Sequence, residues 1–339
     1  MINEDGMLNF LSVLKNKRRV LLVTHARPDG DALGTTAAVS LALRKKNIQS
    51  RVLLFNPRPE KYAFVFEECR LDSFDISKGL PADADIHSFD ALLVMDTGTW
   101  SQLPGLKEIL AGFRGPKLVL DHHLTQEDWA DVKLVDTKAA AAGEIVAELF
   151  DAWGVELDQD IATMLYLAIS TDTGWFQFSN TRPQTLRLAA RLMEAGVDTE
   201  RIYRLAFQNE RPQRLALMAL ALQSMELLAE NRLAVISVGK ADFQRAGADG
   251  ADTENLINLP LQVGSVEVSV FISELPEGGP LRVSLRSKGG VDVAAFAHRF
   301  SNGNGGGHAR AAGLKVSGSL TDTRARLTAA LIAELGRAK

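Results

Sequence analysis

The chain has 339 residues, of which 46% are hydrophobic, 24% charged and 6% aromatic, so it is neither a peptide nor a disordered segment. At roughly 100–200 residues per domain, this length predicts two domains with cores of their own. The 38 Lys and Arg stand against 42 Asp and Glu, and the formal net charge of -4 argues against a protein held on long nucleic acid by bulk positive charge.

The first half of the chain alternates strand-like and helix-like segments. Continuous apolar runs predict buried strands at 18–26, 50–55, 90–98 and 116–123. Helical patterns are found at 31–47, at 139–154 with Gly154 as the stop, at 158–172 with Asp158 or Asp160 as the cap, and at 182–196. This alternation predicts an α/β domain over residues 1–196, with a mostly parallel sheet covered on both faces.

The pattern changes in the second half. Residues 197–212 are polar and loosely patterned, and we predict that they form a linker. A helix is expected at about 213–229, strands at 231–239, 265–275 and 281–290, a short helix at 291–301, a glycine-rich loop, a strand at 312–318 and a final helix. These elements predict a smaller α+β domain over residues 213–339.

The single cysteine, Cys69, excludes an intrachain disulfide framework and favours a reducing compartment. The N-terminus has acids before its apolar stretch and bases after it, the reverse of a secretory signal. No apolar run approaches the roughly 18 residues that span a bilayer. We therefore expect a cytoplasmic protein without a membrane partner. Cys69 is expected to be unreactive, and His87 and His298 to lie on the surface or on the face of a helix.

Histidines and acids gather just after predicted strands, and one acid ends a predicted helix. They are His25, Asp29 and Asp31 in THARPDGDALG, Asp96 in VMDTG, Asp121, His122 and His123 in LDHHLT, and Asp172 in ISTDTGWF. Taken singly, Asp31 can cap the helix it opens, Asp96 can hold a turn and the two histidines can be loop surface. Taken together, the carboxylates repel one another unless cations neutralise them. Mixed His and Asp donors suit manganese, and also iron, cobalt or zinc, and their number suits two ions.

These four segments resemble the four motifs of the DHH phosphoesterase superfamily, and the resemblance covers roughly the first 180 residues. In the second half, NGNGGGHARAAG (302–313) resembles the GGGH signature of the DHH-associated C-terminal domain, and RVSLRSK (282–288) resembles the strand before it. The length and two-domain layout look most like the NrnA type, whose members act on short RNA oligonucleotides and on 3′-phosphoadenosine 5′-phosphate.

The resemblance implies two metal sites, with manganese as the expected metal. The first ion would be held by His25, Asp29 and Asp96, and the second by Asp31, Asp96, His122 and Asp172. Asp96 would bridge the two ions, which share the attacking water. His123 would contact the phosphate or assist the leaving oxygen, and Asp121 would orient a ligand histidine.

The resemblance also implies substrate contacts outside the metal sites. Those in the second domain are Arg286, Gly305, Gly306, Gly307 and His308, with the glycines forming a nest of backbone N–H groups for phosphate. Arg27 either contacts phosphate or supports the acidic loop. The reaction would take place in the cleft between the domains. Trp175, Phe176 and Phe178 either stack a base or pack in the core. Two positions depart from the family pattern: relatives often carry a basic residue at Trp175, and Leu124 replaces a common Pro.

The predicted function is therefore hydrolysis of short single-stranded RNA and dinucleotides to mononucleotides, and of 3′-phosphoadenosine 5′-phosphate to AMP. Two alternatives stay open, a phosphoanhydride hydrolase acting on pyrophosphate or polyphosphate and a nucleotide-sensing protein without turnover. Long duplex nucleic acid is not an expected partner. A homodimer is one assembly compatible with the sequence, which does not fix the oligomeric state, the cleavage polarity, the native metal or the physiological substrate.

Overall fold

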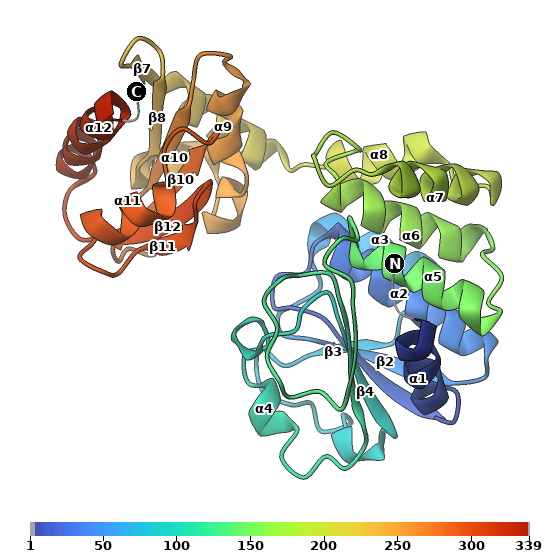
Figure 1. Ribbon diagram of the computed structural model, residues 1–339. Helices are drawn as coiled ribbons and strands as arrows, with labels where there is room; N and C mark the ends of the chain where they lie inside the picture. Colours follow the sequence, from blue (N-terminus) through green and yellow to red (C-terminus); the bar gives the residue numbers. More distant parts are fainter. Residues whose placement is uncertain (1–3, 338–339) are drawn as a thin grey trace. The chain divides into compact units, whose positions relative to one another are not determined.

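The computed structural model describes residues 4–337 and divides the chain into two compact units, residues 1–209 and 210–339 (Figure 1). Each unit has a six-stranded sheet and its own buried core. Among the helices of the described residues, none is long and apolar enough to cross a membrane.

The sheet of the first unit has the strand order β3-β2-β1-β4-β5-β6, and every neighbouring pair is parallel. Its strands are β1 (Arg19–Val23), β2 (Gln49–Leu54), β3 (Ser73–Asp75), β4 (Ala91–Met95), β5 (Lys117–Asp121) and β6 (Val132–Val135). The predicted parallel sheet is thus confirmed. The two edge strands, β3 and β6, escaped prediction because they have three and four residues and only one fully buried side chain each.

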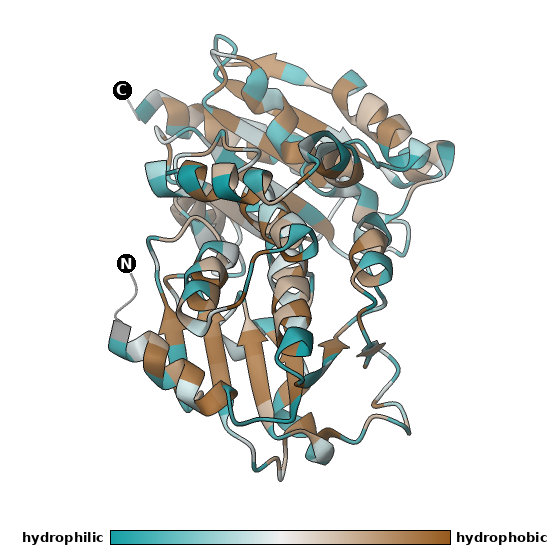
Figure 2. Cartoon of the chain, turned by 90° about the vertical axis from the view of Figure 1, so that its right-hand side faces the viewer, coloured by the Kyte–Doolittle hydropathy of each residue, from teal (hydrophilic) through white to brown (hydrophobic). Residues whose placement is uncertain are grey.

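Side chains of the first sheet alternate between two cores, so that Val20 and Leu22 enter one and Leu21 and Val23 enter the other. The helices of this unit are α1 (Glu4–Leu14), α2 (Gly30–Lys45), α3 (Ala63–Glu68), α4 (Leu106–Ile109), α5 (Ala142–Trp153), α6 (Gln159–Asp172), α7 (Pro183–Glu194) and α8 (Thr199–Phe207). Helices α1, α2, α5 and α6 cover one face, while α4 and loops cover the other (Figure 1). The strands between them are hydrophobic along most of their length, as Figure 2 shows.

Helices α2 and α6 pack closely at Gly34, a contact that fixes the two helices carrying Asp31 and Asp172. A Cβ atom at Gly34 would stand 2.5 Å from the carbonyl oxygen of Met164 and 3.0 Å from the backbone nitrogen of Ala168. We expect Gly34→Ala to lower the free energy of unfolding by about 1–3 kcal/mol through overpacking, although alanine has the better helix propensity.

Urea unfolding followed by circular dichroism measures this effect. Gly6→Ala in α1 is the matched control, because a Cβ atom there would meet nothing within 4 Å. If the two substitutions proved equally harmless, the close approach of α2 and α6 would not need glycine.

The predicted linker at 197–212 is wrong for most of its length, because α8 occupies Thr199–Phe207. Asp198 caps this helix by accepting a hydrogen bond from the backbone N–H of Arg201 at 2.9 Å. Ile202 and Ala206, four residues apart, are buried against the first unit. The polar residues that suggested a linker lie on the exposed face of an amphipathic helix.

The second unit has a mixed sheet with the strand order β11-β12-β10-β9-β8-β7, in which only the pair β8 and β9 is parallel. Its strands are β7 (Glu226–Leu228), β8 (Leu233–Val238), β9 (Val268–Ser273), β10 (Leu281–Ser287), β11 (Gly306–His308) and β12 (Ala311–Val316). Its helices are α9 (Pro212–Gln223), α10 (Lys240–Ala246), α11 (Val293–Phe300) and α12 (Leu320–Arg337). The expected α+β architecture is confirmed, but the helix predicted at 213–229 ends at Gln223 because 226–228 pair with β8.

The glycine-rich segment of the second unit contains a strand where a loop was predicted. Gly306–His308 form β11 at the edge of the sheet, antiparallel to β12. Gly307 has a φ of +142°, and a Cβ atom there would stand 2.3 Å from the carbonyl oxygen of Ala311. These glycines therefore allow a tight hairpin in place of the predicted loop.

Three residues without a predicted function lie where the sequence suggested. Cys69 is buried, and its burial and the charge of Glu68 raise the pKa of its thiol to about 12, so the thiol stays protonated and unreactive at neutral pH. His87 and His298 are exposed.

Candidate metal centre

The histidines and acids predicted for the first unit lie together at the carboxyl edge of its sheet. His25 follows β1, Asp96 follows β4, and Asp121 ends β5. Asp29 and Asp31 begin α2, and Asp172 is the last residue of α6. Parallel strands end at the same edge, so residues far apart in sequence meet there.

Asp96 is at the middle of this cluster. Its Oδ2 lies 3.4 Å from Nε2 of His25, and its Oδ1 lies 3.4 Å from Nε2 of His122. The side chain is buried, and Oδ1 has no hydrogen-bond partner among the described residues. Its backbone is in the left-handed region, with a φ of +61°. A buried carboxylate oxygen without a donor is a position that a cation satisfies.

Three groups of side chains could each hold a metal ion, because the ligand atoms within each group lie within 4.8 Å of one another. They are His25 with Asp29 and Asp96, Asp31 with His122 and Asp172, and Asp96 with His122 and His123. The first group has the residues of the first expected site. The second group has three of the four residues expected for the second site, and the fourth, Asp96, lies 3.4 Å from His122. Imidazole nitrogens and carboxylate oxygens in this number fit divalent transition-metal ions.

The electrostatics of the cluster favour added positive charge. Burial and the neighbouring carboxylates raise the pKa of Asp172 to about 6, against the opposing effect of His122. Burial alone would lower the pKa of His122, but Asp96 and the other carboxylates around it raise it to about 10. Burial would likewise raise the pKa of Asp96, but His122 and His25 hold it below its usual range. The protonated His122 thus neutralises part of the charge that divalent cations would neutralise more fully.

Asp31 also holds the architecture of the site. Its carboxylate accepts hydrogen bonds from the backbone N–H groups of Ala142 at 2.6 Å and Gly143 at 3.1 Å, where α5 begins, and from the hydroxyl of Thr35 at 2.9 Å. The cap of α2 is Asp29, which accepts from Asp31 and Ala32, so the capping role considered for Asp31 at α2 is wrong. Asp31 instead satisfies donors at the start of a different helix.

Asp121 orients His123 and makes no side-chain contact with His122. Its Oδ1 lies 2.7 Å from Nδ1 of His123 and accepts the backbone N–H groups of both histidines. Nδ1 of His122 lies 3.2 Å from the carbonyl oxygen of Ala139. Asp121 therefore orients His123, a member of the third candidate group, while a backbone carbonyl holds His122 with Nε2 directed at the carboxylates.

Three polar residues that sequence reasoning missed support this edge. Gln126 donates to Oδ2 of Asp121 at 2.5 Å, and Thr35 donates to Asp31. Asn180 donates to the backbone carbonyl of Asp172 at 3.1 Å and to that of Ala140 at 3.0 Å. Thr35 lies one helical turn after Asp31, and this spacing in the sequence could have predicted their contact. Gln126 and Asn180 lie in irregular segments, where residue spacing does not predict contacts.

The residues proposed to contact a base or a phosphate near the centre have different surroundings. Trp175 and Phe176 pack with Tyr166 against the core of the first unit, which favours the packing interpretation. Phe178 is 59% exposed. Arg27 is exposed too, and its side chain makes no hydrogen bond within residues 4–337.

Arg286 and His308 lie on one face of the second sheet. Arg286 on β10 and His308 on β11 both pair with Ala311 of β12 between them. Directly opposed residues point to the same side, so the two side chains share a row, about 10 Å apart across two strand spacings. Arg286 is half-buried and burial lowers its pKa, whereas His308 is exposed.

Comparison with known proteins identifies both units. Residues 19–169 match the DHH family, N-terminal domain, and residues 231–336 match the DHHA1 domain. The bifunctional oligoribonuclease and PAP phosphatase NrnA of Thermus thermophilus is 32% identical over 328 residues, covering 94% of this chain and 91% of that protein. The protein of the same name from Bacillus subtilis is 25% identical over 301 residues, covering 88% of this chain and 89% of that one.

A solved structure shows the same fold. The crystal structure of an exopolyphosphatase-related protein from Bacteroides fragilis is 24% identical, with a TM-score of 0.90, covering 100% of this chain and 98% of that one. The two domain matches and the Thermus relative together show that this chain belongs to the DHH family, with a DHHA1 domain after its DHH domain.

Proposed function

We propose that this protein is a two-metal phosphoesterase that hydrolyses short oligoribonucleotides to mononucleotides and 3′-phosphoadenosine 5′-phosphate to AMP. The observation that carries the proposal is Asp96, a buried carboxylate facing two adjoining groups of His and Asp ligands. Full-length similarity to proteins named for both activities supports the choice of substrates.

In this proposal, His25, Asp29 and Asp96 hold one divalent ion, and Asp31, Asp96, His122 and Asp172 hold the other. Such ions, when bound, neutralise phosphate oxygens and activate water. We propose manganese as the metal, because the donor set mixes imidazole with carboxylate.

His123 is proposed as the proton donor or phosphate contact. Its Nδ1 is held by the buried Asp121 at 2.7 Å, and its side chain is 46% exposed. This geometry fixes the ring and leaves Nε2 open to a substrate. A proton on Nε2 is then available to the leaving oxygen of the substrate.

The second unit is proposed to bind the far end of the substrate through Arg286, His308 and the backbone N–H groups of Gly305, Gly306 and Gly307. A guanidinium fork binds phosphate oxygens in a bidentate manner. The outer edge of β11 has no neighbouring strand among the described residues, so its backbone N–H groups can face a ligand. Because this contact serves only the end of a substrate, short oligonucleotides would be preferred to long strands.

A substrate panel tests the function directly. We expect phosphate release from 3′-phosphoadenosine 5′-phosphate and cleavage of labelled dinucleotides faster than of a long oligonucleotide. Faster cleavage of the long strand would contradict the length preference. Phosphate release from pyrophosphate or polyphosphate alone would replace the proposal with a phosphoanhydride hydrolase, and binding without turnover would indicate a sensor.

Removing divalent metal is expected to abolish turnover and to lower the melting temperature. A ligand present at 100 times its Kd stabilises the native state by about 2.7 kcal/mol. Thermal unfolding in EDTA should therefore begin at a lower temperature than in manganese, and comparison with magnesium and cobalt identifies the preferred ion. Equal activity and melting temperature with and without EDTA would contradict a metal centre.

A further inference from the structure

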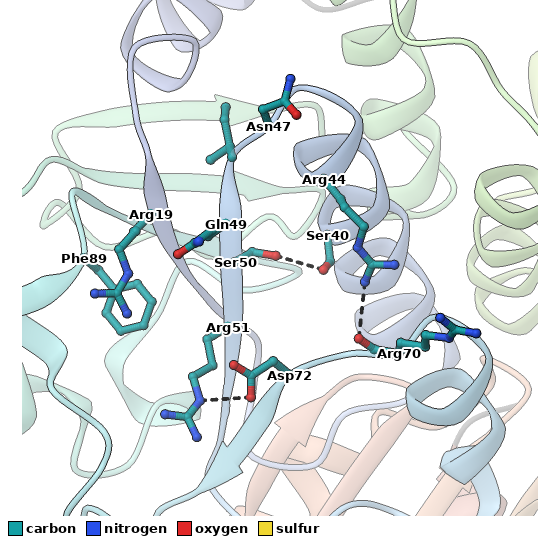
Figure 3. A pocket seen from close by; sticks show the side chains of 11 residues that line it. Arg19, Ser40, Arg44, Asn47, Gln49, Ser50, Arg51, Arg70, Asp72 and Phe89 are labelled. Atoms are coloured by element: carbon teal, nitrogen blue, oxygen red, sulfur yellow. Dashed lines mark hydrogen bonds and ion pairs between the residues drawn. The ribbon is translucent and has the colours of Figure 1, made fainter.

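A polar pocket lies at the amino ends of the strands of the first sheet, whereas the metal centre lies at their carboxyl ends (Figure 3 shows the pocket). It has a volume of about 620 Å³. Its lining comes from the start of β1, the last two turns of α2, the first half of β2 with the two residues before it, and the segments just before β3 and β4. The metal-centre residues follow the carboxyl ends of the strands. Since β1 has five residues and a strand rises about 3.3 Å per residue, roughly 16 Å of sheet separates the two sites. The pocket is therefore not part of the metal centre.

Positive charge dominates this pocket, although the whole chain has a formal net charge of -4. Its lining contains one acid, Asp72, and four arginines, which are Arg19, Arg44, Arg51 and Arg70. We call this site the arginine pocket. Such a local excess of guanidinium groups favours anions.

Two of the arginines are partly engaged with the protein. Arg51 forms ion pairs with Asp72 at 3.1 Å and with Asp83 at 3.0 Å, and both acids are exposed. Arg44 donates from one terminal nitrogen to the carbonyl oxygens of Cys69 and Arg70. A guanidinium has five N–H donors, so Arg44 keeps donors that these bonds do not use.

The side chains of the other two arginines, Arg19 and Arg70, are not paired with acidic side chains of the described residues. The guanidinium of Arg19 lies over the ring of Phe89, 5.0 Å from its centroid. No carboxylate of residues 4–337 forms an ion pair with Arg19 or with Arg70, and neither side chain donates a hydrogen bond within that range. Stacking on Phe89 uses the face of Arg19 and leaves its N–H edge for a planar, bidentate acceptor.

Hydroxyl groups form the middle of the arginine pocket. Oγ of Ser40 and Oγ of Ser50 are 2.9 Å apart. In Figure 3, Arg44 and Arg70 lie to one side of this pair, and Arg19 and Arg51 lie to the other. A single small anion can contact the arginines on one side of the serines, whereas linked anionic groups can contact the arginines on both sides.

We propose that the arginine pocket binds a small polyanion with two or more linked phosphate groups. The volume is in the range of about 300–1,000 Å³ that is usual for small-molecule sites. Guanidinium groups match phosphate oxygens in charge and geometry, and hydroxyls add further donors. The linked phosphates can come from a phosphoanhydride chain or from the backbone of a short oligonucleotide.

Isothermal titration of the whole protein in EDTA tests the proposal, because carboxylates without metal repel phosphate at the metal centre. The probes are inorganic tripolyphosphate and a 5′-phosphorylated dinucleotide, with adenosine as the phosphate-free control. We expect one tripolyphosphate or dinucleotide per chain and no adenosine binding. The double variant Arg19→Ala/Arg70→Ala should raise Kd at least about tenfold.

A matched variant makes the result specific. Arg204→Ala removes an exposed arginine of α8, which lies in the same unit and outside the pocket. This substitution should not change Kd by more than roughly twofold. The single variant Arg70→Ala repeats the test if the double variant unfolds. Binding of both probes, or of one, supports the pocket and identifies the source of the phosphates.

Two outcomes overturn the proposal. One is the absence of binding by either probe at about 1 mM. The other is a Kd that rises equally in Arg204→Ala, or does not rise in the pocket variants. Neither outcome depends on turnover, so the proposed function and the arginine pocket can fail separately.

Discussion

Replacing Asp96 by asparagine is expected to reduce turnover of dinucleotides and of 3′-phosphoadenosine 5′-phosphate by about 1,000-fold or more. The substitution keeps the size of the side chain and removes one negative charge from a carboxylate that belongs to two of the three groups of candidate ligands. Steady-state kinetics with saturating manganese measures the effect. The rise in melting temperature that manganese produces should shrink in the same variant.

The fold of this variant is expected to persist, which separates loss of chemistry from loss of structure. Asparagine tolerates the φ of +61° found at position 96, and its backbone N–H can still donate to the carbonyl oxygen of Leu120. The matched control is Asp136→Asn, since Asp136 follows β6 at the same edge but belongs to none of the three ligand groups. Turnover within about tenfold of the parent in Asp96→Asn would show that this carboxylate is dispensable.

Substituting Glu144 by alanine is expected to lower the free energy of unfolding by about 3 kcal/mol, the low end of the range for removing one partner of a buried ion pair. Glu144 is buried in the first turn of α5. Its carboxylate accepts hydrogen bonds from Arg182 at 2.5 Å, from the backbone N–H of Ala140 at 2.9 Å and from the hydroxyl of Thr185. The substitution leaves these donors without their acceptor and loosens α7 from α5.

Denaturant unfolding of Glu148→Ala provides the comparison. Glu148 lies one turn further along α5 with an exposed side chain, so its removal should change the free energy of unfolding by less than about 0.5 kcal/mol. Similar losses in the two variants would show that the buried pair with Arg182 adds nothing to stability.

The sheet of the first unit and the position of the candidate centre could be predicted because both depend on local patterns. Continuous apolar runs fixed β1, β4 and β5 as buried parallel strands, and the polar residues after them had to meet at one edge. His25, Asp96 and His122 do lie together there. Their action as metal ligands stays a prediction.

The features that escaped prediction depend on contacts between distant segments. Helix α8 is polar on average, and only its packing against the rest of the first unit shows that Ile202 and Ala206 form a buried stripe. The glycines of β11 looked like a flexible loop, but pairing with β12 makes them a strand. The partner of Asp121 could not be read from LDHHLT either, because two adjacent histidines were equally near in sequence.

The left-handed backbone of Asp96 has a consequence for how such a protein is engineered. A non-glycine residue in this region costs about 1 kcal/mol or more, whereas His122 and His25 offset the cost of burying the charge of this carboxylate. Glycine would relieve the backbone cost at this position, so a library screened only for heat resistance samples a change that removes the shared carboxylate. Such a library should therefore be screened for turnover as well, because chains that gain stability at residue 96 are expected to be inactive.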